Sequence, residues 1–124
     1  MYSRIVVGTD GTDRSLIAVD HAARLAAAFS AELHVVATAT PDESATTVAK
    51  IGHDASKRHG VRVVEHPQVG ELASVLIAVA DAVDADLIVV GNTGMLGHIR
   101  KFTGSVPSRL AHQSRRPVLI VHTG

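Results

Sequence analysis

The sequence predicts a single α/β domain built on an open, five-stranded parallel sheet with helices on both faces. Five short apolar runs, each about four residues of Val, Ile and Leu, are spread evenly along the 124 residues, which is typical of strands buried on both faces. Stretches with helical periodicity separate these runs. Regular alternation of strands and helices predicts a parallel sheet, and a chain of this length is expected to form one domain.

The helical stretches differ in strength. Apolar residues recur at helical spacing from Ala18 to Phe29 and again from Leu72 to Val83. The stretch from Pro41 to His59 is more polar, but its weaker apolar stripe also predicts a helix. A short last helix is expected from Pro107 to about Ser114. The five predicted strands are Ile5–Val7, Leu33–Val36, Val61–Val64, Leu87–Val90 and Val118–Val121.

The order of the strands is not decided by this pattern alone. Right-handed crossovers leave two common orders for five parallel strands, 3-2-1-4-5 and 2-1-3-4-5. In both, a ligand is expected at the carboxyl ends of the strands, at the point where the order reverses. The loops after strand 1 and after strand 3 or 4 are therefore the places to examine.

Composition excludes several classes of function. Twelve basic residues balance twelve acidic ones, so no net charge favours nucleic acid or an anionic membrane. Without cysteine there are no disulfides, thiolate metal sites or cysteine nucleophiles. The eight histidines lack metal-ligand spacing, so we expect surface or hydrogen-bonded histidines. No signal peptide and no apolar run of ~20 residues is seen, so the expected location is the cytoplasm.

Two glycine-containing segments follow strands that end at the expected ligand edge. The first runs from Gly8 to Asp13, and the second, from Gly91 to Ser105, holds four of the ten glycines. Glycine permits a positive φ and a close approach of the backbone to a ligand. Gly104-Ser105 leads into the last helix, whose N-terminus is suited to an anion. These features predict a phosphate-bearing ligand across strands 1 and 4, and the alternative is that the glycines only form tight turns.

Other phosphate-binding motifs are absent. There is no G-x-x-x-x-G-K-[ST] and no G-x-G-x-x-G after strand 1. Gly8 stands where a haloacid-dehalogenase phosphatase has its nucleophilic aspartate. Asp10 lacks the carboxylate cluster of a response-regulator receiver, and no aromatic residue is placed to stack on a flavin.

The second glycine segment resembles a known signature. Gly91-x2-Gly94-x9-Gly104-Ser105 matches, residue for residue, the G-x2-G-x9-G-[ST] nucleotide signature of the universal stress protein family. The segments 7–12, 86–91 and 116–121 are similar to the first, fourth and last strands of that family, so the resemblance covers essentially the whole chain. It implies the strand order 3-2-1-4-5.

The resemblance also implies a binding site, because family members with this signature bind ATP. Asp10 would lie near the ribose or a phosphate-bound Mg²⁺, with Thr9 beside it. Val36 and Ala37 would line the adenine pocket and offer backbone hydrogen bonds. The implied set is completed by residues around the ribose and phosphates, namely Gly91, Asn92, Gly94, His98, Gly104, Ser105 and Val106.

The function implied by the resemblance is that of a stress-response sensor or regulator that binds ATP with Mg²⁺. We expect little or no catalysis, because no residue is visible that would orient His98 as a base. A weak ATPase on the same site and a partner-binding protein with an empty site are the alternatives. The segments 91–92, 104–107 and 118–123 also resemble an actinobacterial branch of the family in which cyclic AMP (cAMP) binding is known. The sequence does not choose between ATP and cAMP.

The last predicted strand suggests self-association. Val118, Leu119, Ile120 and Val121 form an apolar strand near the end of the chain, and an exposed apolar edge is a pairing hazard unless a partner covers it. Antiparallel pairing of two copies about a two-fold axis predicts a homodimer, as the family resemblance also implies. The charges of the third strand, Arg62 and Glu65, are expected on a solvated edge.

Overall fold

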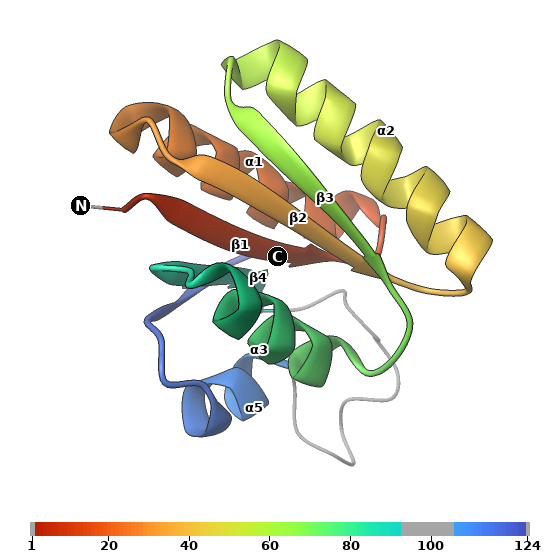
Figure 1. The fold of residues 1–124 in the computed structure, drawn as a ribbon, viewed down its shortest axis with the longest axis vertical. Coiled ribbons are helices and arrows are strands. Elements are labelled where there is room, and N and C mark those ends of the chain that lie inside the picture. Colours follow the sequence, from red (N-terminus) through yellow and green to blue (C-terminus); the bar gives the residue numbers. More distant parts are fainter. Residues whose placement is uncertain (1, 93–105, 124) are drawn as a thin grey trace.

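The computed structural model describes residues 2–92 and 106–123. Five parallel strands form one sheet in the order β3-β2-β1-β4-β5, which confirms the predicted α/β class and the strand order implied by the resemblance (Figure 1). The strands are β1 (Arg4–Thr9), β2 (Glu32–Thr38), β3 (Arg62–Gln68), β4 (Leu87–Gly91) and β5 (Val118–Val121). The described helices are α1 (Asp13–Phe29), α2 (Pro41–His59), α3 (Leu72–Val83) and α5 (Val106–Gln113).

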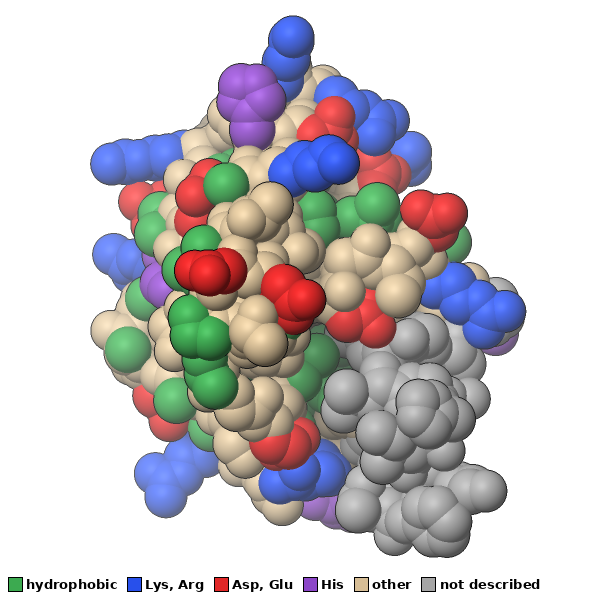
Figure 2. All heavy atoms as spheres, turned by 90° about the vertical axis from the view of Figure 1, so that its right-hand side faces the viewer, with side chains coloured by type: hydrophobic (Ala, Val, Ile, Leu, Met, Phe, Trp, Pro, Cys, Tyr) green, Lys and Arg blue, Asp and Glu red, His purple; other side chains and the backbone are tan. Residues whose placement is uncertain are grey.

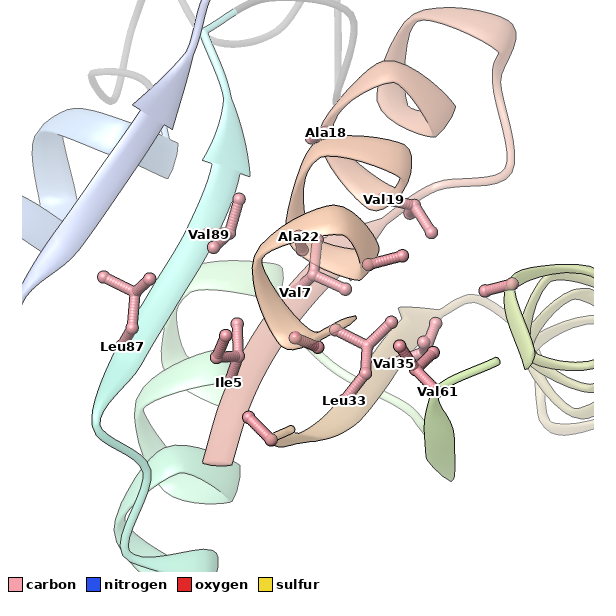
Figure 3. Close-up of a cluster of buried hydrophobic side chains, with 14 of the residues drawn as sticks. Ile5, Val7, Ala18, Val19, Ala22, Leu33, Val35, Val61, Leu87 and Val89 are labelled. Carbon is pink, nitrogen blue, oxygen red and sulfur yellow. The ribbon is translucent and has the colours of Figure 1, made fainter. Parts of the chain in front are cut away.

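Two apolar clusters, one on each face of the sheet, form the core. On one face, side chains of β1, β2 and β4 point toward α1, whose alanines allow the helix to lie close to the sheet (Figure 3). Ile5, Leu33 and Val89 are fully buried there. On the other face, α3 and α5 pack against Val6, Val36 and other residues of the alternate register. Burial of each such side chain stabilises the fold by about 1.5–3 kcal/mol.

Helix ends explain why the polar stretch from Pro41 to His59 is helical despite its weak apolar stripe. Thr40 caps the helix by accepting a hydrogen bond from the Glu43 N–H, and Pro41 occupies the first turn. Acidic residues begin α2 and basic residues end it, which complements the helix dipole. Gly60 follows at φ +66°, a left-handed conformation suited to glycine.

Strand ends differ from the prediction. β1 continues through Gly8 to Thr9, and β3 continues to Gln68, past Pro67. Proline is tolerated there because β3 is an edge strand and needs fewer backbone donors. Arg62 and Glu65 are exposed on this edge strand, as expected. In the described part of the chain, no helix has the length and apolar character needed to cross a membrane.

Candidate functional site at the carboxyl ends of the strands

The structure brings several predicted site residues together at the carboxyl ends of the strands. β1 and β4 are neighbours, and Thr9 lies opposite Ala37 at the ends of β1 and β2. Asp10 follows β1 directly, and Asn92 follows β4. Figure 2 looks onto the side toward which the arrowheads of β1, β2 and β3 point in Figure 1, and acidic and basic side chains are mixed there.

The turn after β1 holds the Asp10 carboxylate in a fixed direction. Its Oδ1 accepts hydrogen bonds from the Thr12 N–H at 3.0 Å and from the Thr12 hydroxyl at 2.6 Å. Gly11 adopts φ +84°, which glycine does without strain. No protein hydrogen bond to Oδ2 is seen among the described residues. One carboxylate oxygen is therefore left to accept a ligand hydroxyl or to meet a cation.

Thr9 shapes this turn from inside the protein. The residue is fully buried, and its Oγ1 accepts a hydrogen bond from the Gly11 N–H at 3.0 Å. The same hydroxyl lies 2.6 Å from the hydroxyl of Ser15, which itself donates to the Thr12 carbonyl. Ser15 was missed by the sequence analysis, although a hydroxyl on the buried side of a helix was a signal that could have identified it.

Gly8 has a different role from the one that the sequence suggested. It lies within β1 rather than in the loop, so its interpretation as part of a ligand loop was wrong. A Cβ atom on Gly8 would lie 2.8 Å from Cδ1 of Leu76 on α3. Gly8 therefore allows α3 to pack closely on β1 just before the candidate site.

The end of β2 offers backbone rather than side-chain atoms. Val36 is fully buried in the α3 cluster and Ala37 is buried in the α1 cluster, so the two side chains point to opposite faces. Neither side chain is exposed at the edge. A ligand there would meet the main chain where β2 ends.

The polar groups of Asn92 bind the end of the chain. Its Oδ1 accepts from the Thr123 N–H at 2.7 Å, and its Nδ2 lies 3.2 Å from Nδ1 of His122. The Asn92 N–H donates to the Val121 carbonyl. Asn92 therefore ties the residue after β4 to the segment after β5.

Only the margins of the signature segment are described. Gly91 is the buried last residue of β4, opposite Val121 of β5. Val106 begins α5 and is buried in the α3 cluster. The predicted residues Gly94, His98, Gly104 and Ser105 lie outside the described residues.

An ion pair links α3 and α5, which cover the same face of the sheet. Glu71 caps α3 by accepting hydrogen bonds from the N–H groups of Ala73 and Ser74, and its carboxylate also contacts the guanidinium of Arg109 on α5. Partial burial raises the pKa of Glu71, but the bonds from Ser74 and Ala73 and the charge of Arg109 outweigh it, so the pKa lies below its ordinary value. This pair was not predicted from the sequence, because its two members are far apart along the chain.

A groove of about 750 Å³ lies between α1 and α2 and reaches Gly11, the residue after Asp10. Gly11 and Thr47 line one part of it, and Asp20 and His59 line another. Of the predicted site residues that the structure describes, none lines this groove. Within residues 2–92 and 106–123, no three histidine or acidic side chains are grouped to hold a metal ion.

The strand order and the residues at the carboxyl ends of the strands are typical of nucleotide-binding α/β domains. Comparison with known proteins identifies the family. The model of the universal stress protein family matches residues 1–122, and the chain belongs to that family. The universal stress protein Rv1636 of Mycobacterium tuberculosis is 38% identical over 98% of this chain and 97% of its own length. A universal stress protein of Methanocaldococcus jannaschii, MJ0531, is 31% identical over 98% of this chain and 82% of its own length.

Solved structures agree with this assignment. A universal stress protein crystallised in complex with cAMP is 40% identical, with a TM-score of 0.87, and the match covers 99% of this chain and 98% of that one. A universal stress protein from Archaeoglobus fulgidus in complex with dAMP is 27% identical, with a TM-score of 0.76 over 96% of this chain and 97% of that one. The family therefore includes members that bind adenine nucleotides.

Proposed function

We propose that this protein binds an adenine nucleotide at the carboxyl ends of β1 and β4 and acts as a stress-response sensor or regulator. The observation that carries the proposal is the Asp10 carboxylate, oriented by Thr12 with one oxygen free, at the end of a strand adjacent to β4. The segment after β4 carries the Gly91-x2-Gly94-x9-Gly104-Ser105 signature. A ribose-binding acid and a phosphate-binding segment thus follow neighbouring strands.

Each part of the nucleotide has a proposed partner. The free Asp10 oxygen accepts ribose hydroxyls or contacts a phosphate-bound Mg²⁺. The main chain at Val36 and Ala37 meets the adenine ring, since both side chains are buried. Gly91, Gly94, Gly104 and Ser105 surround the ribose and phosphates. The N–H of Val106, at the start of α5, adds a donor at a helix end that favours anions.

ATP with Mg²⁺ and cAMP are the two candidate ligands. The signature and the position of Asp10 support ATP, because a carboxylate beside a triphosphate can share its Mg²⁺. The 40% identical structure that was crystallised with cAMP supports cAMP. The two nucleotides share adenine and ribose, so the same residues serve both.

The arrangement favours binding over catalysis. Among the described residues, histidines pair with carboxylates at His34–Glu32 and His59–Asp20. Glu32 begins β2 and His59 ends α2, so both pairs lie toward the amino ends of the strands, away from Asp10. Neither of these two pairs is therefore placed to activate water beside a bound phosphate.

Calorimetric titration of nucleotide-free protein tests the proposal, once with ATP and Mg²⁺ and once with cAMP. We expect saturable binding of at least one nucleotide, with negligible release of phosphate from ATP. Gly104→Val should abolish this binding, because a branched side chain blocks the close approach of phosphates, while the circular dichroism spectrum stays unchanged. The proposal would be contradicted if neither nucleotide bound, or if Gly104→Val bound with unchanged affinity.

We also propose a homodimer formed through β5. This strand is an edge of the sheet, and Ile120 is 45% exposed on it, with Val118 and Leu119 partly exposed. Pairing with a second copy would cover the apolar side chains and satisfy the free backbone groups of the edge.

A further inference from the structure

A chain of three polar side chains crosses from β2 to the edge strand β3, where His66 lies opposite Val36 in the strand register. His34 Nε2 lies 3.1 Å from Oε1 of Glu32, and His34 Nδ1 lies 2.8 Å from Nε2 of His66. His34 is only 4% exposed, whereas Glu32 and His66 are partly exposed. We refer to Glu32, His34 and His66 together as the histidine chain.

The position of each proton follows from the acceptors. A carboxylate can only accept, so the His34 nitrogen that faces Glu32 carries a proton and donates it. Neutral His34 then has an unprotonated Nδ1, which accepts from the Nε2–H of His66. The remaining nitrogen of His66, Nδ1, has no hydrogen-bond partner within the described residues. Both hydrogen bonds are thus satisfied when the two rings are neutral.

The two imidazole rings meet head-on. Their centroids are 5.1 Å apart with a tilt of 31°, and this separation is about the N···N distance plus the two ring radii. The facing nitrogens therefore lie almost on the line between the rings. A tetrahedral metal ion needs two nitrogens that converge at an angle, so this geometry suits a shared proton better than a metal.

The number of protons decides whether this contact attracts or repels. A first added proton leaves one donor and one acceptor between the rings, so the hydrogen bond persists. A second proton places N–H groups face to face on two positive rings. We propose that the histidine chain is a proton-operated latch, which holds β3 against β2 with up to one added proton and opens with two.

The surrounding charges do not offset the second proton. Glu32 is shared with Arg62 of β3 at 3.5 Å and Arg4 of β1 at 3.9 Å, so its negative charge is already balanced. On α3, which packs against β1 and β2, the titratable residues are Asp81, which binds Arg116, and Glu71 at the N-cap, which pairs with Arg109. Among the described residues, no further carboxylate is seen to face the rings.

The pKa of His66 agrees with this mechanism. Burial, and then the neighbouring His34, lower the pKa of His66 from its ordinary value of 6.5. The closed latch therefore resists a proton that the open state accepts. Its stabilising effect is complete above pH 6.5 and is lost as the pH falls from there toward the lowered pKa.

Hydrogen exchange of backbone amides across pH 7.5 to 5, corrected for the intrinsic exchange rate, tests the latch. We expect the opening constant of β3 amides to rise with acid by up to about tenfold per pH unit, while amides of the central strand β1 change less. His66→Gln keeps an Nε2–H donor but does not titrate, so its β3 amides should lose this pH dependence. His21→Gln, an exposed histidine on α1, is the matched control and should behave as wild type.

The latch is overturned if β3 exchange in the wild type is independent of pH, or if His66→Gln keeps the wild-type dependence. If His66→Gln does not fold, nitrogen-15 spectra of the wild-type imidazoles decide the matter. The two rings should then take up protons in two separate steps, with the second below pH 6.5. Two independent titrations near pH 6.5 would refute the proposal.

Discussion

The hydroxyl of Thr9, at the end of β1, lies 2.6 Å from the hydroxyl of Ser15 in the first turn of α1, and both residues are fully buried. Thr9 also accepts from the Gly11 N–H. The contact fixes how the chain turns from β1 into α1. It thereby fixes the direction of Asp10, which stands between them in the sequence.

Ser15→Ala is expected to destabilise the protein by about 1–3 kcal/mol, because the buried Thr9 hydroxyl loses the acceptor for its proton. Urea denaturation measures the loss. Ser56→Ala, at an exposed position of α2, is the control and should change stability by less than about 0.5 kcal/mol. Equal effects in the two variants would show that the Thr9–Ser15 contact contributes nothing of its own.

Gly8→Ala should destabilise the fold by about 1–3 kcal/mol, since the new methyl group overlaps the Leu76 side chain. Leu76→Ala should itself cost about 2–5 kcal/mol through the cavity that it leaves. In the Leu76→Ala background, however, the Gly8→Ala change should cost much less. Denaturant unfolding of the four proteins measures this coupling, and strict additivity would contradict the contact.

Asp10→Asn should weaken binding of ATP with Mg²⁺ by about tenfold to a hundredfold, the usual effect of losing hydrogen bonds to a charged group. The effect on cAMP should be smaller, because the 3′-oxygen of cAMP is esterified and only its 2′-hydroxyl can donate. Calorimetry measures both affinities. Asp13→Asn, in the first turn of α1, is the control, and an equal loss there would remove the special role of Asp10.

Ile120→Lys should convert the proposed dimer into monomers, because a charge at the edge of β5 opposes strand pairing. Sedimentation velocity distinguishes the two states. Ile17→Lys alters an exposed isoleucine of similar accessibility on α1, and it should leave the assembly unchanged. Persistence of the dimer in Ile120→Lys would place the interface elsewhere.

Glu71→Gln should lower stability at neutral pH by about 1 kcal/mol, through the weaker cap of α3 and the lost pairing with Arg109. Because the folded-state pKa of Glu71 is lowered, its contribution is complete above its ordinary pKa of 4.5 and is lost as the pH falls through the lowered value. The difference between wild type and variant should therefore be largest at pH 7 and small at pH 3. A difference in stability that does not change with pH would refute this account. Glu65→Gln, at an exposed position of β3, is the control.

The described helices and strands were largely predictable. A strand that is buried on both faces of a parallel sheet must be apolar along its whole length, which produces short apolar runs such as Leu87–Val90. Element ends were less predictable. Pro67 and Gly8 are both unfavourable in an isolated strand, yet Pro67 lies on an edge and Gly8 faces Leu76. In each case the place of the strand in the fold, which the local sequence does not reveal, explains the residue.

The sequence by itself determined the fold class, the family resemblance and the places where a ligand would be sought, since these depend on residue type and spacing along the chain. Only the tertiary structure decided what individual polar groups face. Asn92 binds Thr123, Thr9 binds Ser15, and His34 meets His66 across two strands. The partners of Asn92 and His34 lie about thirty residues away along the chain. Local spacing carries no information about such contacts, because they form only when the sheet aligns its strands.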